Sequence, residues 1–183
     1  MSVGFVTLFL ALLAIVAQVS LAGALILWLG RRSTALGRLG ASVRDSVGPQ
    51  ALTMAFAVAL VCTVGSLYLS EVARYVPCKL CWYQRIAMYP LVLIMLVAML
   101  RKDHRVAAYV LPLTVIGGLV SIYHVLLERF PELEGVSSCD PDNPCSAILL
   151  QRFGYLTIPT MALSGFALIT VLVLVARNWA SED

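Results

Sequence analysis

The sequence predicts an all-α membrane protein, organised as a four-helix transmembrane bundle plus an additional N-terminal transmembrane helix. Of its 183 residues, 61% are hydrophobic and only 13% are charged, whereas a soluble domain is usually nearer half apolar and a quarter charged. Five apolar runs come close to the roughly 20 residues that a helix needs to cross a lipid bilayer. These runs cover residues 4–29, 50–71, 80–100, 106–127 and 156–176.

The first run is predicted to remain in the protein as a transmembrane helix. No basic residue precedes it, and at roughly 25 apolar residues it is longer than the apolar region of a signal peptide. The segment that follows is predicted to be a linker because it is rich in glycine and ends in a proline. Those residues are Gly30, Gly37, Gly40, Gly48 and Pro49. We therefore divide the chain into residues 1–49, the extra helix with its loop, and residues 50–183, the four-helix domain.

Charge is distributed unevenly between the two ends of the predicted helices. Basic residues follow the first, third and fifth runs: Arg31, Arg32, Arg38, Arg44, Arg101, Lys102, Arg105 and Arg177. The other ends carry Glu71, Glu128, Glu132, Glu134, Asp140 and Asp142. The positive-inside rule makes the basic side cytoplasmic, with the N-terminus outside and the C-terminus inside. A net charge of +3 is too small to indicate a nucleic-acid partner.

The third run begins with a CxxC motif, formed by Cys78 and Cys81. Two cysteines at this spacing are typical of redox-active sites. Pro77 ends the preceding segment, so Cys78 is expected in the first helical turn, where the helix dipole favours a thiolate. Arg85, seven residues after Cys78, returns to nearly the same direction on a helix. Two further side chains lie close to this stripe, Gln84 and Met88.

Arg85 is predicted at or just inside the membrane boundary, where a cation is costly and often functional. It can stabilise a cysteine thiolate or donate hydrogen bonds to a carbonyl of a bound quinone. The alternative is that Arg85 only reaches toward lipid phosphates.

A second pair, Cys139 and Cys145, brackets a polar loop rich in turn-forming residues. One interpretation is a structural disulfide that closes the loop. A zinc site of four cysteines is another, which we disfavour because Arg85 would repel the metal; no metal is expected. The third interpretation is thiol–disulfide exchange coupled to an electron carrier in the membrane. It follows from the topology, which places both pairs on the exterior, where disulfides persist.

Two more residues have chemistry of their own. His124 is predicted near the outer end of the fourth run, at the depth of the CxxC motif. It can bind or protonate a quinone oxygen, or simply hydrogen-bond a carbonyl or water. Cys62 lies in the middle of the second run and is expected to pack as a small apolar side chain.

These residues together resemble the DsbB family of disulfide bond formation proteins, in the branch typical of Gram-positive bacteria. The segment 77–90 reads PCKLCWYQRIAMYP, which is similar to the family signature. Tyr123 and His124 in the fourth run, and Thr157-Ile158-Pro159 in the fifth, strengthen the resemblance. It covers roughly residues 50–177.

The resemblance implies a four-helix thiol oxidoreductase of the bacterial cytoplasmic membrane. Such a protein reoxidises a thioredoxin-like, DsbA-type partner and passes the electrons to ubiquinone or menaquinone. Cys139 would receive the partner's thiolate, Cys145 would pass electrons to Cys78, and Cys81 would lie nearest the quinone. The residues implied or predicted on the quinone side are Arg85, His124 and Gln84.

Two features depart from the family pattern. The first helix is additional to the usual four, and the loop cysteines are only six positions apart. A quinone or vitamin-K-epoxide reductase with the same four cysteines is the alternative function. A membrane protein with two structural disulfides and no enzymatic activity is a further alternative.

Overall fold

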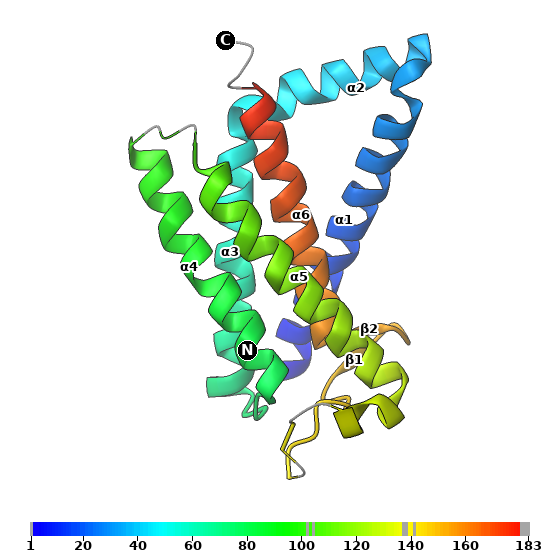
Figure 1. Ribbon diagram of the computed structural model, residues 1–183, viewed down its shortest axis with the longest axis vertical. Coiled ribbons are helices and arrows are strands. Elements are labelled where there is room, and N and C mark those ends of the chain that lie inside the picture. The colour runs from blue at the N-terminus through cyan, green and yellow to red at the C-terminus, as the bar shows by residue number, and fades with distance from the viewer. Residues whose placement is uncertain (1, 102, 104, 137–138, 141, 180–183) are drawn as a thin grey trace.

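The computed structural model describes residues 2–101, 103, 105–136, 139–140 and 142–179 (Figure 1). Its α-helices are α1 (Val3–Leu29), α2 (Thr34–Val47), α3 (Ala51–Leu67), α4 (Lys79–Arg101), α5 (Ala107–Arg129) and α6 (Ile158–Trp179). A π-helical turn, Tyr68–Val72, extends α3, and a 3₁₀ segment, Pro131–Val136, follows α5. Two short strands, β1 (Gln151–Arg152) and β2 (Leu156–Thr157), precede α6. Lys102, named above among the basic residues, lies outside the described part of the chain.

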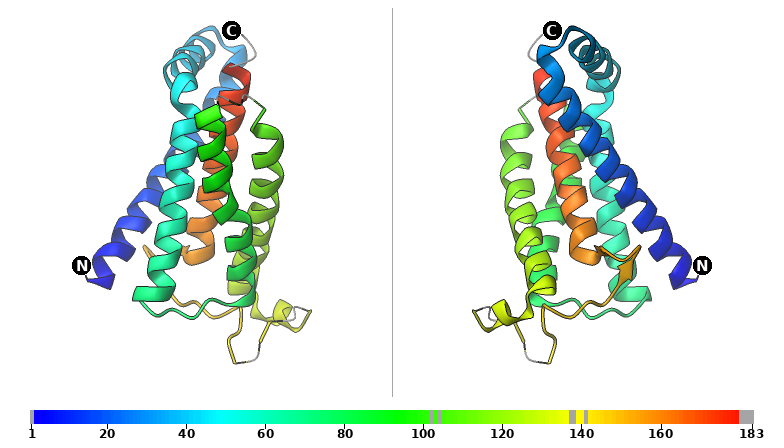
Figure 2. Two further views of the ribbon diagram at one scale, coloured as in Figure 1. Left: turned by 90° about the vertical axis from the view of Figure 1, so that its left-hand side faces the viewer. Right: turned by 90° about the vertical axis from the view of Figure 1, so that its right-hand side faces the viewer.

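The predicted fold class is confirmed. Within the described residues, five helical segments are long and apolar enough to cross a membrane. Helices α3, α4, α5 and α6 form a bundle in which each helix packs against two neighbours, and α1 packs against α6 from outside (Figure 2). The chain is thus a multi-pass helical membrane protein with four bundled helices and one added helix.

Small side chains and a few large ones share the bundle interior. Ala55 and Ala59 of α3 are fully buried, which lets the neighbouring backbones approach closely, as in other membrane bundles. Phe166 of α6 fills the space against α5, where Gly117 lies. A Cβ atom at Gly117 would be 2.3 Å from the Phe166 ring, so a side chain at this position is incompatible with the packing.

The segment predicted as a linker is not a loop, because most of it forms α2. Its N-terminus is capped by Ser33, whose Oγ accepts a hydrogen bond from the Leu36 backbone N–H at 3.2 Å. Leu36, Leu39 and Val43 follow helical spacing, although Leu39 and Val43 are exposed, and the helix contains two internal glycines. Gly37 is required by packing, since a Cβ there would lie 2.9 Å from the Arg31 carbonyl oxygen. Helix α2 crosses the end of the bundle beside the end of α6 (Figure 1).

The excursion between α5 and α6 shapes the opposite end. Strands β1 and β2 pair antiparallel, with Gln151 opposite Thr157 and Arg152 opposite Leu156. Gly154, at φ +78°, makes the tight turn between them. Helix α6, which the fifth apolar run predicts to start at residue 156, therefore begins at residue 158, because residues 156 and 157 are paired in the hairpin. This excursion and the start of α4 lie at the same end of the bundle (Figure 1).

Candidate functional site

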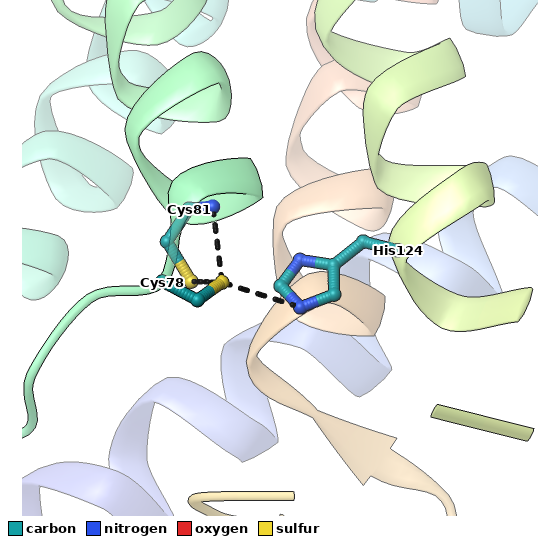
Figure 3. Close-up of side chains that lie close together, drawn as sticks. All are labelled: Cys78, Cys81 and His124. Atoms are coloured by element: carbon teal, nitrogen blue, oxygen red, sulfur yellow. Dashed lines mark hydrogen bonds between the residues drawn. The ribbon is translucent and has the colours of Figure 1, made fainter. Parts of the chain in front are cut away.

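Cys78 directly precedes α4 and caps its first turn. Its carbonyl accepts a hydrogen bond from Trp82 N–H at 3.2 Å, and its Sγ atom accepts one from Cys81 N–H at 3.4 Å. This is the bonding of an N-cap residue, with sulfur in the place of the usual oxygen. The two Sγ atoms are 3.0 Å apart, longer than the roughly 2.05 Å of a disulfide bond, so both cysteines are thiols here (Figure 3).

The surroundings of Cys78 favour its thiolate. The side-chain hydrogen bond with Cys81 has the largest effect in lowering the pKa of the Cys78 thiol. His124 and the Cys81 backbone N–H lower this pKa further, while burial raises it. Because its sulfur faces N–H donors, we assign Cys78 as the acceptor in the hydrogen bond between the two sulfurs.

His124 of α5 connects the cysteine pairs. Its Nε2 atom lies 3.6 Å from Cys78 Sγ and 3.1 Å from the Cys145 carbonyl oxygen (Figure 3). Its Nδ1 atom lies 3.5 Å from the Gln84 side-chain nitrogen, which can only donate. The geometry therefore assigns the neutral ring its proton at Nε2, shared between the Cys145 carbonyl and the Cys78 sulfur.

The loop cysteines form a disulfide, with 6.0 Å between their Cα atoms. Asn143, inside this loop, donates a side-chain hydrogen bond to the Pro77 carbonyl at 3.2 Å, which holds the loop against the start of α4. Cys78 and Cys145 share one buried cluster, and Cys81 and Cys139 pack against it. Cys145 is fully buried whereas Cys139 remains partly exposed. The fold thus brings together all four cysteines of the two predicted pairs.

Glu134 orders the same loop from one side. Its carboxylate accepts hydrogen bonds from the Ser146 hydroxyl and from the backbone N–H groups of Cys145 and Ser146. Burial raises the pKa of Glu134, but these hydrogen bonds lower it by more, so that it lies below its usual range. No motif in the sequence pointed to Glu134, because its partners are eleven and twelve residues away.

Near neutral pH, we expect Glu134→Gln to raise the rate at which a water-soluble phosphine reduces the Cys139–Cys145 disulfide about two- to fivefold, because the loop is held less firmly. The carboxylate has a lowered native pKa, so its stabilisation is complete above the ordinary value of 4.5 and is lost as the pH falls through the native one. The wild-type loop should therefore become easier to reduce in acid, while the variant should show no such change. Glu132→Gln, at an exposed neighbour, is the control. Equal acid sensitivity in both variants would contradict this assignment.

An apolar cavity of about 350 Å³ opens beside Cys81. Its walls come from α1, α3, α4 and α6. The polar or thiol side chains in its lining include Ser66, Tyr75, Cys81, Gln84, Arg85 and Tyr89. Most of them lie toward the cysteine-bearing end of the bundle, whereas Tyr89 lies near the middle of α4. The cavity is therefore more polar beside Cys81 and more apolar deeper in the bundle.

Arg85 is held in place on two sides. Its Nη2 atom donates a hydrogen bond to the Ser66 carbonyl at 3.1 Å, and its guanidinium lies 5.3 Å from the centre of the Trp82 ring. Tyr89 donates to the Ser66 hydroxyl at 3.2 Å, which fixes the same turn of α3. Arg85 thus lines the cavity from a braced position, and Ser66 is a contributor that sequence reasoning missed.

The predicted stripe along α4 is only partly correct. Cys81, Gln84, Arg85 and Met88 all line the large cavity. Cys78 does not, because it precedes the helix and the rotation of 100° per residue does not reach it. It lines a smaller space with His124, and Cys81 borders both spaces. His124 therefore lies on the cysteine side, and it is not among the residues that line the large cavity within the described part of the chain.

A zinc site of four cysteines is not formed, because Cys139 and Cys145 are bonded to each other. Cys62, expected to pack as a small apolar side chain, lies against Gly165 of α6 and also lines the large cavity.

Comparison with known proteins places this arrangement in a family. The family model described as "Disulfide bond formation protein DsbB" matches residues 49–176. "Disulfide bond formation protein C" of Bacillus subtilis is 44% identical over 131 residues, which are 72% of this chain and 95% of that protein. A "Probable disulfide formation protein" of Oceanobacillus iheyensis is 46% identical over 124 residues, 66% of this chain and 84% of that protein. No solved structure matches.

A third relative, "Probable disulfide formation protein C 1" of Bacillus anthracis, is 40% identical over 128 residues, which are 70% of this chain and 92% of that protein. These matches confirm the resemblance inferred from the CxxC signature, including its Gram-positive branch. The matched region contains both cysteine pairs, Arg85 and His124, whereas α1 and α2 lie outside it. With two cysteine pairs packed together at one end of a transmembrane bundle, this chain belongs to the DsbB family of disulfide bond formation proteins, membrane oxidoreductases that form disulfides.

Proposed function

We propose that this protein is a thiol:quinone oxidoreductase that reoxidises a thioredoxin-like, DsbA-type partner and delivers the electrons to a membrane quinone, ubiquinone or menaquinone. The observation that carries the proposal is the position of Cys81. It borders the small space shared with Cys78 and His124, and it also lines the large apolar cavity with Arg85. A thiol pair with one sulfur toward a protein disulfide and one toward an apolar cavity is suited to pass electrons between them.

The first step is exchange with the partner at the loop. A partner thiolate attacks Cys139, the more exposed sulfur, which breaks the Cys139–Cys145 bond and releases Cys145 as a thiolate. The second thiol of the partner then displaces Cys139. The partner leaves as a disulfide, and the loop pair has gained two electrons.

The second step passes these electrons to the helix pair when that pair is a disulfide. The Cys145 thiolate attacks Cys78, with which it shares a buried cluster, and Cys81 leaves as a thiolate. Cys139 then displaces Cys78 and re-forms the loop disulfide. His124 contacts both Cys78 and the Cys145 backbone, so its Nε2–H can stabilise negative charge on Cys78 during the exchange.

The cavity suits a quinone in size and in chemistry. Its volume of about 350 Å³ falls in the range of ligand pockets, about 300–1,000 Å³. When bound, a quinone accepts two electrons and two protons and leaves as quinol. Arg85 and Gln84 would hold its carbonyl end near Cys81, and the apolar walls would take its tail. The helix pair returns to a disulfide, which completes the cycle.

The orientation in the membrane belongs to this proposal. We place the protein in the bacterial cytoplasmic membrane with its N-terminus outside, its C-terminus inside and both cysteine pairs on the extracytoplasmic face. The basic side chains Arg38 and Arg44 of α2, Arg101 and Arg177 support this orientation, because they lie at or near the end opposite the cysteines.

In intact cells, a membrane-impermeant maleimide should label the site cysteines after mild reduction, and the more exposed Cys139 should react faster than the buried Cys145. The reason is that both pairs lie on the side predicted to face outward. As a control, Ser42→Cys on α2, in a chain without the four site cysteines, should be labelled only after permeabilisation. The reverse labelling pattern would invert the topology and reject the redox scheme.

The function itself is tested with purified components. Reduced DsbA-type protein, the purified chain and either ubiquinone or menaquinone are mixed without oxygen, and quinone absorbance is followed. We expect one quinone reduced for each partner disulfide formed. No quinone reduction with either quinone would reject the proposal, while turnover of a vitamin K epoxide would favour the reductase alternative.

A further inference from the structure

Helix α1 is outside the family match, yet it is fixed firmly to the bundle. Thr7, Ala11, Ala14 and Ala17 are its buried side chains, and all of them lie in its N-terminal part. This part crosses the outer side of α6 and α3 (Figure 2). An added helix that only anchored the chain in lipid would have no need of a defined orientation on the bundle.

Polar contacts set that orientation. Gln18 donates to the Ser164 hydroxyl of α6 at 3.0 Å and accepts from the Tyr155 hydroxyl at 2.7 Å. One turn from the start of α1, Thr7 accepts from Arg152 Nη2 at 2.7 Å. Side-chain hydrogen bonds of this kind fix the rotation of a membrane helix about its axis. The same face of α1 must therefore always point toward the bundle.

The face so presented forms a wall of the large cavity. The α1 residues that line it are Leu10, Leu13, Ala14, Val16 and Ala17. Leu10 lies against α3, where a Cβ added at Gly65 would be 3.0 Å from Leu10 Cδ2. Gly65 precedes Ser66, whose carbonyl accepts the Arg85 hydrogen bond. The α1 wall thus begins at the depth of the Arg85 guanidinium.

The other walls explain what α1 adds. They come from α3, α4 and α6, which belong to the four-helix region matched by the family, together with the segments before α4 and α6. Where α3 and α6 meet, the bundle has no further helix of its own to cover the cavity on the lipid side. Helix α1 occupies that position.

We propose that α1 is a specificity element of the acceptor site, with Leu10, Leu13 and Ala17 in direct contact with the bound quinone. This inference rests on the proposed function. It assigns to residues 10–17 the task of limiting which ring substituents and which first part of the tail fit beside Cys81 and Arg85. A protein with only the four-helix bundle would leave this side of the quinone in lipid.

Leu13 and Leu12 provide a matched pair for testing the contact. The two leucines are adjacent and similarly exposed, 36% and 48%, but only Leu13 lines the cavity. We expect Leu13→Ala to raise the quinone KM at least about fivefold, since the loss of pocket methylenes has effects of this size or greater. Leu12→Ala should stay within about twofold. Both variants should exchange disulfides with the partner at the wild-type rate, which reports an intact fold without involving the quinone.

Binding can be read directly with an azido-substituted quinone. After photolysis of the full-length protein, we expect labels on residues 10–17 as well as on α4, and competition by unlabelled quinone should remove both. If the wild-type protein reduces quinone but the labels lie only on α3 and α4, or if Leu13→Ala behaves like Leu12→Ala, the role of α1 is overturned and the proposed function stands. If the wild-type protein neither reduces quinone nor shows competed labelling, both are overturned.

Discussion

Replacing Cys145 with alanine is expected to stop turnover and to leave Cys139 as a lone thiol that captures the partner permanently. The capture uses a DsbA-type protein with a single redox cysteine, activated as a thionitrobenzoate mixed disulfide. Cys139 should displace the thionitrobenzoate and form a stable bond, because its buried resolving partner is gone. Turnover should fall at least about a thousandfold, as for the loss of other essential nucleophiles. Non-reducing gels and mass spectrometry measure the adduct.

The converse variant is the control. Cys139→Ala also removes one loop sulfur, but the remaining Cys145 is fully buried against Cys78. Capture should therefore be at least about tenfold slower, because reaction requires an accessible thiolate. Quinone is kept in the mixture so that the helix pair stays oxidised. An adduct on Cys78 or Cys81, or faster capture by Cys145, would reverse the proposed order of transfer.

Replacing Arg85 with methionine should weaken the quinone side and leave the partner side unchanged. Hydrogen bonds to a charged group contribute about 1.5–3 kcal/mol, so the quinone KM should rise roughly tenfold or more. Arg85→Lys should be milder, because lysine keeps the charge and loses only the planar fork that reaches both a ligand and Ser66. Steady-state rates with each substrate varied in turn measure the effect.

Arg101→Met is the matched control for this prediction. Arg101 is exposed at the far end of the same helix and is not among the residues lining the cavity. Its substitution should leave both KM values within about twofold of wild type. If Arg85→Met does the same, Arg85 is only an anchor beside Trp82 and Ser66, and the quinone must bind elsewhere.

Several properties of this protein follow from the sequence alone. Hydropathy decides which segments enter a bilayer, because only a long apolar helix can satisfy its backbone there. The alternation of spans then places Cys78, Cys81, Cys139 and Cys145 at one end without any knowledge of packing. The CxxC signature with Arg85 was specific enough to identify the family, since it depends on residues that are close in the chain.

Other properties required the tertiary structure, because they depend on which distant segments meet. Helical periodicity gives directions relative to one helix axis, so it grouped Cys78 with Arg85 but could not show that the capping residue turns toward His124. Glycine content suggested a loop where packing against Arg31 and the end of α6 stabilises α2.

Hydropathy alone does not show that Leu10 and Leu13 face a cavity while Leu12 faces lipid, since apolar side chains surround most of this helix. That choice is made by Gln18, Thr7 and their partners more than 130 residues away, whose hydrogen bonds set the rotation of the helix. The sequence thus determined the membrane topology and the redox pairs, whereas contacts between distant segments decided which side chains surround them.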